Sequence, residues 1–506
     1  MSAQFIRYEM KNGVQYAAIC YPQRINGKKI NRYEHLGRVI SKDLGLFQSK
    51  SRGVFAYTPQ HGYITDEDTL APLIEQVPAA LEPPEKLIVD FGDAWLLHEL
   101  LQKGPYFSMI CNVFADQALS ICAILFHKIL ANTSHRHAQT WLEGSYARIL
   151  FKGANLRSQN ITKLLRLLGD EALQRDFFKA YLAYLCPNAR AGVLIDSTGL
   201  PNAINFPLTA TSVHENQISQ ETRLILVVER ITNLPLFFRY NAGNIVDVST
   251  LTATINELQA LGVATQYAIV DAGYYSKNNI EELYANNIAF LSRLGSNRKL
   301  YKEIVSEHID DVLQAKYAVL YNKRVVHIKK IPVKLSPANS GFAYLAVDMQ
   351  RKHSESYTYM RDALQDQVDA DEMDRELKKF GIFVLISSEN IETQEILALY
   401  YTRQVIEQIF DIDKNNLDLV PVRIHSEATF RGHLMLTFLA SILLLPINRE
   451  LAEGKHCTIE AFSIMRNLKC KIYDKKIFVK EATKQMKEIT ELLQVKIPIL
   501  LTGPNI

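Results

Sequence analysis

The chain has 506 residues, of which 48% are hydrophobic and 22% charged, the composition of an ordinary globular protein with a large buried core. Its 57 Lys and Arg against 54 Asp and Glu exclude a uniformly basic nucleic-acid coat and an acidic disordered scaffold. Six cysteines without a Cys-x-x-Cys pair argue against a disulfide-stapled secreted scaffold or a zinc ribbon. The sequence opens without an apolar signal segment, so we expect a cytoplasmic protein.

Residues 1–82 are predicted to form a basic, β-rich N-terminal region. The first 53 residues carry ten Lys and Arg against three acids, and two β-rich stretches flank the hairpin signal INGKKI. Residues 455–487 are also basic, with nine Lys and Arg against three acids. Charge alone favours solvated faces here, and the alternative is a pair of surfaces that face nucleic acid.

Residues 83–188 are predicted to be helical. A break at Gly169-Asp170 separates two amphipathic stretches, SQNITKLLRLL and EALQRDFFKAYLAYL. This pair is either a helix-turn-helix that reads DNA or an ordinary pair of packed helices, and base rates favour ordinary packing.

The chain from residue 189 onward is predicted to be an α/β domain with an insertion. Apolar runs in residues 189–297 follow the order β-β-β-α-β-α-β, which indicates a mixed sheet covered by helices. A strand-rich insertion is expected at 298–380, the second part of the domain at 381–448, and a basic helical region at 449–506. The apolar run at 434–446 is too short to span a bilayer and is interpreted as part of a buried core helix.

Two aspartates follow buried strands of this predicted sheet. Asp196 ends the run VLID, and Asp271 ends the run YAIVD. Each alone is best interpreted as a turn-capping residue, because small residues follow both. Together, at the ends of two strands of one sheet, they can converge on a divalent cation.

A polar helix is predicted over residues 392–414. The spacing of four of its polar residues decides whether the two aspartates are turn caps or metal ligands. At about 100° per residue, Tyr400, Arg403, Glu407 and Lys414 share one helix face of about 60°. In isolation, such a face is a solvated one with a weak Arg403–Glu407 pair. The pattern Tyr-x₂-Arg-x₃-Glu-x₆-Lys is, however, the signature of a large group of bacterial transposases.

The chain therefore resembles the DDE transposases of bacterial insertion sequences, over residues 190–445. The resemblance implies a ribonuclease H-like catalytic domain in which Asp196, Asp271 and Glu407 are catalytic and hold two Mg²⁺ or Mn²⁺ ions. It places Tyr400, Arg403 and Lys414 beside the scissile DNA strand.

The same resemblance implies the partners and the location of the protein. It implies double-stranded DNA of the element ends and of the target, a homodimer in the DNA-bound complex, no membrane, and a nucleoid-associated prokaryotic protein. The candidate contacts to the terminal repeats in the N-terminal region are Lys28, Lys29, Arg32 and Arg38.

Two alternative functions stay open at this point. One is a ribonuclease H-like metal-dependent nuclease without strand transfer, and the other is a catalytically silent DNA-binding relative. The Tyr, Arg and Lys companions favour the transposase over a generic nuclease, which needs only the acids. The three intact acids weigh against a silent protein.

Overall fold

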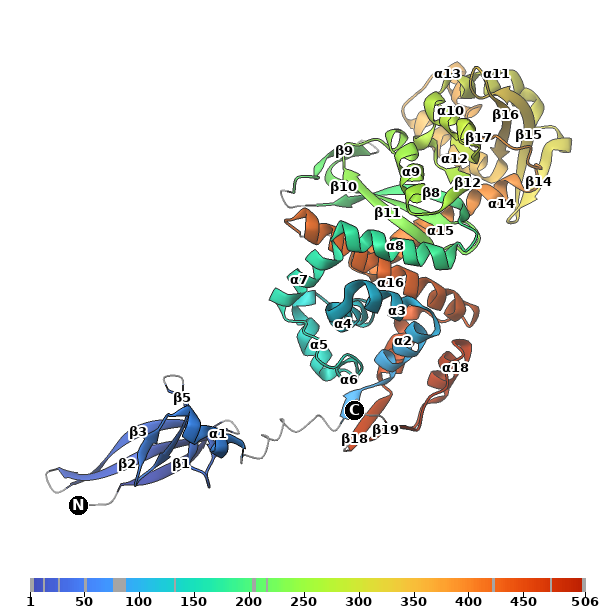
Figure 1. The fold of residues 1–506 in the computed structure, drawn as a ribbon. Helices are drawn as coiled ribbons and strands as arrows, with labels where there is room; N and C mark the ends of the chain where they lie inside the picture. The colour runs from blue at the N-terminus through green and yellow to red at the C-terminus, as the bar shows by residue number, and fades with distance from the viewer. Residues whose placement is uncertain are drawn as a thin grey trace. The chain divides into compact units, whose positions relative to one another are not determined.

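The chain divides into two compact units, Met1–Leu87 and Ile88–Ile506. Both units are drawn in Figure 1. The computed structural model describes residues 4–11, 14–25, 28–49, 52–75, 88–131, 133–202, 206–214, 217–420, 424–473 and 476–502.

The first unit is a six-stranded antiparallel sheet in the order of the chain, followed by one helix. Its core contains Ile19, Leu36, Phe47 and Phe55, which come from strands two to five. The β-rich character is that predicted from the sequence. The elements are β1 (Phe5–Lys11), β2 (Val14–Ile25), β3 (Lys28–Ser41), β4 (Leu46–Ser49), β5 (Gly53–Thr58), β6 (Gly62–Ile64) and α1 (Glu67–Glu75).

The second unit begins with a short strand and then a helical region. These elements are β7 (Ile88–Asp90), α2 (Gly92–Lys103), α3 (Tyr106–Phe114), α4 (Ala118–Leu130), α5 (Ala138–Gly144), α6 (Ala147–Leu150), α7 (Ser158–Leu168) and α8 (Glu171–Leu185). The helices α7 and α8 are the pair considered as a helix-turn-helix. Helix α7 packs against α16 (Glu427–Glu453), and α8 buries Phe177 and Tyr181, which favours ordinary helical packing.

Helix α16 connects the helical region to the sheet. It contacts α4, α7 and β11, and it lies between these two parts of the unit in Figure 1. At 27 residues it is longer than the apolar run predicted, because polar residues on both sides continue the helix. By length and composition α16 and Tyr106–Leu130 are each able to cross a membrane, but 89% of the apolar window of α16 is buried inside the protein.

A ten-stranded mixed sheet forms the centre of the second unit. Its order is β11-β10-β8-β12-β13-β17-β16-β15-β14, with β9 paired to β10. The strands β8, β12 and β13 are parallel, and the other pairs are antiparallel. The predicted α/β class and mixed sheet are confirmed. The strands are β8 (Arg190–Pro201), β9 (Ala210–His214), β10 (Gln217–Glu229), β11 (Pro235–Ala242), β12 (Ala264–Val270), β13 (Ala289–Leu294), β14 (Ala318–Tyr321), β15 (Arg324–Lys334), β16 (Ser340–Asp348) and β17 (Ile382–Ser387).

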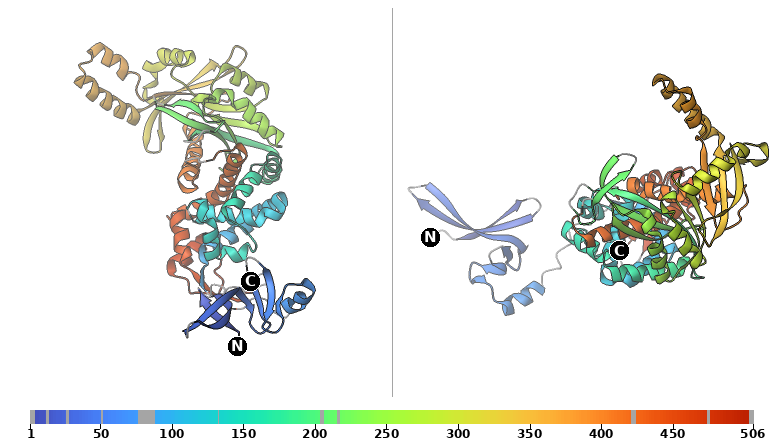
Figure 2. Two further views of the ribbon diagram at one scale, coloured as in Figure 1. Left: turned by 90° about the vertical axis from the view of Figure 1, so that its left-hand side faces the viewer. Right: turned by 90° about the horizontal axis from the view of Figure 1, so that it is seen from above.

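Residues 298–380 differ from the strand-rich insertion that we expected. The described segment contains three strands, β14 to β16, which extend the central sheet, and three helices that hold more residues than the strands. The helices were hard to detect because α12 buries only Ala363 and so has no apolar stripe. Figure 2 shows α12 and α13 extending away from the sheet. The helices of the two sheet segments are α9 (Leu251–Ala260), α10 (Lys277–Ala285), α11 (Lys299–Val312), α12 (Met349–Gln365) and α13 (Ala370–Leu377).

The C-terminal region is also more strand-rich than the basic helical region that we expected. Two strands lie between its helices and a third follows them, and these three strands form a four-stranded sheet with β7 in the order β20-β19-β18-β7. Buried side chains on short strands, such as Cys470 and Ile477, explain the difference, since runs of four or five residues show no clear period. The elements are α17 (Thr458–Arg466), β18 (Lys469–Tyr473), β19 (Lys476–Val479), α18 (Lys484–Leu492) and β20 (Leu500–Thr502).

Candidate active site

Two aspartates meet at one position of the central sheet. The parallel ladder between β8 and β12 ends with the pair Ile195 and Val270, and Asp196 and Asp271 are the next residues on the two strands. We expected Asp196 at the end of its strand, but β8 continues through it because β10 still pairs with β8 on the other side. The neighbouring strand β12, and not β8, ends here.

The third acid lies on a helix that is broken where we expected it to be continuous. The predicted helix 392–414 is divided into α14 (Ile396–Tyr401), α15 (Gln404–Asp411) and a π-helical turn, η6 (Ile412–Asn416). The Thr402 hydroxyl donates to the Leu399 carbonyl at 2.7 Å, and the Arg403 amide donates to Tyr400 at 3.2 Å, one residue short of the helical partner. A threonine hydroxyl that bonds to the backbone in this way competes with the helical ladder.

Arg403 contacts all three acids. One guanidinium nitrogen, Nη1, donates to Oδ2 of Asp196 in a short contact. The other, Nη2, lies 3.0 Å from Oε1 of Glu407 and 3.7 Å from Oδ1 of Asp271. The Arg403 and Asp196 side chains are 15% and 14% exposed, whereas Asp271 and Glu407 are 40% and 55% exposed. The pair with Asp196 is therefore the buried part of the site, and the other two acids face solvent.

Tyr400 and Lys414 reach the same two strands from the same helical segment. The Tyr400 hydroxyl donates to Oδ1 of Asp271 at 3.3 Å. The Lys414 ammonium donates to the Thr198 hydroxyl at 2.5 Å, two residues after Asp196. Burial raises the pKa of the Tyr400 phenol and lowers the pKa of the Lys414 ammonium. Tyr400 and Arg403 thus contact the aspartates directly, Glu407 is linked to them through Arg403, and Lys414 lies at Thr198 on the strand of Asp196.

Asp196 is held in an environment that disfavours its charged form. Burial raises the pKa of Asp196 to about 6, and the positive charge of Arg403 acts in the opposite direction. The negative charges of Asp271 and Asp247 raise the pKa of Asp196 further. A carboxyl group in such a position gains from any additional positive charge that is brought to it.

Asp247 is a site residue that the sequence did not indicate. Its Oδ1 accepts from the Ser197 hydroxyl at 2.6 Å and from Nη1 of Arg223 at 3.0 Å. Gly273 lies against it, since a Cβ atom there would be 3.2 Å from Oδ2 of Asp247. Asp247 therefore contacts the segment that follows Asp196, at Ser197, and the segment that follows Asp271, at Gly273. No fixed spacing relates Asp247 to these acids, so only the fold brings it to the site.

The family of the chain follows from a comparison of its sequence with protein families. The family described as "Transposase DDE domain" matches residues 187–443, half of the chain and a range that contains the whole site above. The chain belongs to this transposase family. This confirms the resemblance predicted from the Tyr-Arg-Glu-Lys spacing over residues 190–445. Among curated proteins, none matches this transposase.

Two solved transposase structures are similar to the chain at low identity. A cryo-EM structure of the piggyBac transposase synaptic complex with hairpin DNA is 10% identical, with 74% of this chain and 79% of that chain covered and a TM-score of 0.37. The Drosophila P element transposase strand transfer complex is 9% identical, with 72% and 89% covered and a TM-score of 0.19.

The donor atoms of the three acids fit a hard divalent cation. Carboxylate oxygens are the ligands that Mg²⁺ and Mn²⁺ prefer. Within the part of this transposase that the structure describes, however, no three His, Cys, Asp or Glu side chains are close enough to hold one ion. The guanidinium of Arg403 lies among the carboxylates and offsets part of their negative charge.

The N-terminal candidates for DNA contact lie in the first unit of the transposase. The side chains of Lys28 and Lys29 are outside the described residues. Arg32 and Arg38 are exposed on β3, opposite Tyr21 and Tyr16 of β2. They belong to a different compact unit from the three acids.

Proposed function

We propose that this transposase binds the terminal repeats of an insertion sequence, cleaves DNA at the element ends by two-metal-ion hydrolysis and joins the 3′-hydroxyl ends to target DNA. The observation that carries the proposal is the contact of one arginine, Arg403, with three carboxylates at the end of a parallel strand pair. Apart from the additional strand β9, which pairs with β10 only, the order β8-β10-β11-α9-β12-α10-β13 supports a ribonuclease H-like assignment of the catalytic sheet.

Asp196, Asp271 and Glu407 are the proposed ligands of two Mg²⁺ or Mn²⁺ ions. When bound, such ions activate a water or a 3′-hydroxyl on one side of the scissile phosphate and stabilise the leaving oxygen on the other. Three carboxylates around one position repel one another, and Arg403 compensates for this repulsion in the metal-free protein. Arg403 and the cations therefore compete for the same oxygens.

The three companions of the acids are proposed to hold the scissile strand. Arg403 and Lys414 supply positive charge to its phosphates, and a guanidinium can contact a phosphate through two parallel hydrogen bonds. Tyr400 donates to Asp271 and so fixes the orientation of that carboxylate. When metal ions take the oxygens of the acids, the Arg403 guanidinium loses its partners, and a phosphate of the DNA strand would replace them.

The proposed partners follow from the reaction. Two element ends must be held together while they are joined to a target, so we infer a homodimer in the complex with double-stranded DNA. We infer a cytoplasmic, nucleoid-associated protein that works without a membrane. The exposed Arg32 and Arg38 are the proposed contacts to the terminal repeats, with Lys28 and Lys29 beside them in the sequence.

Excision from a donor plasmid that carries the gene with its native flanking DNA tests the proposal. We expect excision by the wild type and by Glu395→Gln, a matched change of an exposed glutamate just before α14. Glu407→Gln should lower excision by a factor of about 100 or more, because it removes one charged ligand. Its binding to the element ends should be unchanged.

The outcomes separate the alternatives. Excision by Glu407→Gln at the wild-type level contradicts the assignment of the third acid. Cleavage without joining of a 3′-hydroxyl end, assayed on labelled element ends and a target plasmid, indicates the nuclease. Binding without any Mg²⁺-dependent cleavage by the wild type indicates the silent relative.

A further inference from the structure

Helix α12 of the insertion exposes an apolar stripe to solvent. Four large apolar side chains on this helix are exposed, and the exposed fractions are 66% for Tyr357 and Leu364, 43% for Met360 and 40% for Met349. At about 100° per residue these four side chains lie within an arc of about 80°. Single apolar residues are normal on a protein surface, whereas several on one helix face form a patch, which is the usual mark of an interaction site.

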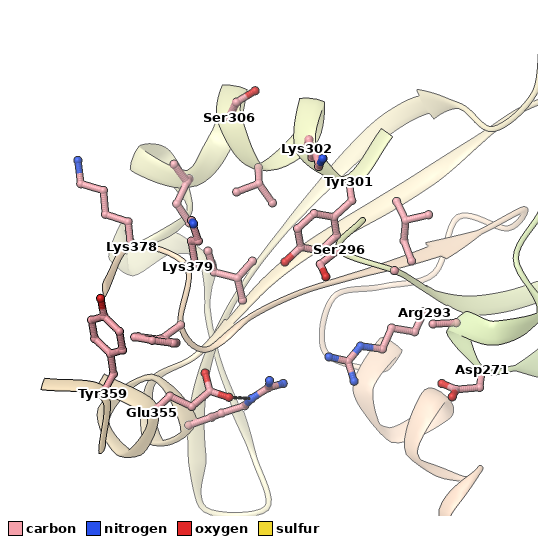
Figure 3. Close-up of a pocket in the computed structure, with 18 of the residues that line it drawn as sticks. Asp271, Arg293, Ser296, Tyr301, Lys302, Ser306, Glu355, Tyr359, Lys378 and Lys379 are labelled. Atoms are coloured by element: carbon pink, nitrogen blue, oxygen red, sulfur yellow. Dashed lines mark hydrogen bonds and ion pairs between the residues drawn. The ribbon is translucent and has the colours of Figure 1, made fainter. Parts of the chain in front are cut away.

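The apolar stripe lies on the side of α12 that faces away from the catalytic acids. The other side of the helix lines a cavity of about 1190 Å³, together with α11 and the end of β13, and this cavity reaches Asp271. Figure 3 shows Glu355 and Tyr359 of α12 at the cavity. Because α12 and α13 extend away from the sheet (Figure 2), the stripe is open to another molecule.

Residues 349–379, which comprise α12, α13 and the two lysines that follow and are here called the arm, have opposite charges at their two ends. The tip, residues 362–374, contains six acids and no Lys or Arg. The base, by which the arm joins the sheet, consists of residues 349–353 and 375–379 and carries five Lys and Arg against one acid. Acids at the C-terminal end of a helix are unfavourable, because the helix dipole is negative there. A basic partner at the tip would relieve this repulsion.

We propose that the arms of two copies of this transposase pair with each other through the stripes of α12 in antiparallel orientation. The acidic tip of each arm then lies beside the basic base of the other, whereas a parallel pair would bring like charges together. The contact is isologous, because the same stripe serves both copies. The proposal rests on the proposed function for the second copy, which is bound at the other element end.

The size of the stripe indicates which partner covers it. With 17 residues, α12 is about 25 Å long and about 10 Å wide, so one face of it covers about 250 Å². A stable interface between free proteins buries about 800 Å² on each partner. The stripe alone is too small to capture a partner from solution. A second copy held on the same DNA has an effective concentration on the order of millimolar, at which such a contact forms.

Cross-linking with a bismaleimide tests the orientation, on complexes of the full chain with element-end duplex in EDTA, which prevents cleavage. Tyr357→Cys, in the middle of the stripe, should link the two copies. Met349→Cys and Leu364→Cys lie about 22 Å apart along the helix, so each alone should give little product and a mixture of the two variants should link. The wild type treated in the same way gives the background of the native cysteines, of which Cys457 is exposed.

Sedimentation velocity with a labelled duplex tests the contribution of the stripe. Tyr357→Ser with Leu364→Ser should raise the protein concentration needed for complexes with two copies about tenfold, because the contact loses apolar surface on both copies. Binding of a single copy to the duplex should be unchanged, since both residues are exposed. The control Thr358→Ser with Gln365→Ser changes two exposed polar residues on the other side of α12 and should leave the required concentration as in the wild type.

Two-copy complexes that do not link through Tyr357→Cys overturn the proposal, and so does a required concentration that is the same in the serine variant and the wild type. Linking of Met349→Cys to itself at the level of Tyr357→Cys contradicts the antiparallel orientation. Excision by the wild type together with one of these results removes only the contact between the arms. Cross-links in the predicted pattern with a protein that does not excise keep the contact and remove the proposed reaction.

Discussion

At the scale of the residue, the charge balance of the site depends on Arg403. Its side chain is 15% exposed and contacts Asp196, Asp271 and Glu407, so these carboxylates share one cation. Removal of one partner from a buried ion pair leaves an uncompensated charge. The more exposed Asp271 and Glu407 lose less than Asp196 does, since water screens their charge.

We predict that Arg403→Ala lowers the free energy of unfolding in EDTA by about 1–3 kcal/mol, the range for a lost hydrogen bond to a charged group. Saturating Mg²⁺ should restore most of this loss, because the cation takes the place of the guanidinium. Urea unfolding with and without Mg²⁺ measures both values. Arg361→Ala, which removes an exposed pair with Asp362, is the control and should have little effect in either condition. An equal loss in both conditions contradicts competition between Arg403 and the ions.

Most residues of the site were predictable, and the exception has a physical reason. Tyr400, Arg403, Glu407 and Lys414 lie on one short segment, so their spacing is visible in the sequence. Asp247 lies 50 residues from Ser197, its hydrogen-bond partner, and follows a loop without a periodic pattern. Only the pairing of the strands brings such a residue to the site.

At the scale of the element, the crossing of α7 and α16 depends on glycine. A Cβ atom on Gly432 would lie 1.7 Å from the Leu165 carbonyl oxygen, and one on Gly169 would lie 1.8 Å from that of Ala428. The backbones of the two helices therefore approach each other more closely than any other residue permits. This contact holds α16 under the sheet strand β11 that it also touches.

We predict that Gly432→Ala lowers the free energy of unfolding by about 1–3 kcal/mol, the usual cost of overpacking. The sign of this change in the free energy of unfolding is informative, because glycine to alanine at an uncrowded position inside a helix stabilises a protein by about 0.5–1 kcal/mol. Chemical denaturation followed by circular dichroism measures the change. Glu450→Ala, an exposed position on the same helix, is the matched control. A gain in stability would show that the two helices are not in this close contact.

The elements that were predicted correctly have a clear pattern of apolar residues in the sequence, and the others do not. The strands β8 and β12 are runs of buried apolar residues, and α16 contains the longest apolar run. Helix α12 has a single buried residue, Ala363, so its pattern is that of a polar stretch. The break between α14 and α15 depends on the Thr402 hydroxyl, which a helical wheel does not represent.

A buried polar cluster joins α4, η6 and α16 behind the site. Asp413, next to Lys414 in η6, accepts a short hydrogen bond from Ser441 of α16. Burial raises the pKa of Asp413 to about 7, and the nearby Lys128 of α4 acts in the opposite direction. Burial lowers the pKa of Lys128 to about 8. Three histidines also have pKa values lowered by burial and by the charge of Lys128, namely His127, His135 and His433.

We predict that the wild type loses stability relative to Asp413→Asn as the pH rises from about 4 to about 8. The unfolded chain releases the Asp413 proton near its ordinary pKa of 3.8, whereas the folded protein keeps it up to about 7, so rising pH favours unfolding. The histidines have the opposite sign, because their lowered pKa values cost stability as the pH falls. The wild type and Asp413→Asn both contain these histidines, so their contribution cancels when the free energies of unfolding of the two proteins are subtracted. The difference should reach up to about 4 kcal/mol, at about 1.4 kcal/mol for each pKa unit.

Urea unfolding at several pH values, followed by circular dichroism, measures this difference. Asp310→Asn, an exposed position on α11, is the control and should show a difference that does not change with pH. A difference for Asp413→Asn that is constant across the range would mean that the carboxyl group is charged in the folded protein.

At the scale of the whole molecule, the chain consists of two units with separate cores. The core of the first unit contains Phe47 and Phe55, and that of the second runs from the helical region through the central sheet. The charge is divided within the first unit, because residues 1–53 carry ten cations against three acids, whereas residues 54–87 carry one cation against six acids. The three acids and the cavity both belong to the second unit. The basic stretch 1–53 and the three acids lie in different units, which favours recognition of DNA by one unit and reaction in the other.

We predict that Arg32→Ala with Arg38→Ala in the full chain weakens binding to element-end duplex and lowers the slope of log K against log salt by about 2. Each phosphate contact contributes about 0.9 to this slope for double-stranded DNA, so two lost contacts account for the change. Both side chains are exposed on β3, and the fold should not suffer. Anisotropy of a labelled duplex at several salt concentrations gives the slope, with Lys152→Ala and Lys179→Ala as the control. A slope equal to that of the wild type would remove these two arginines from the interface.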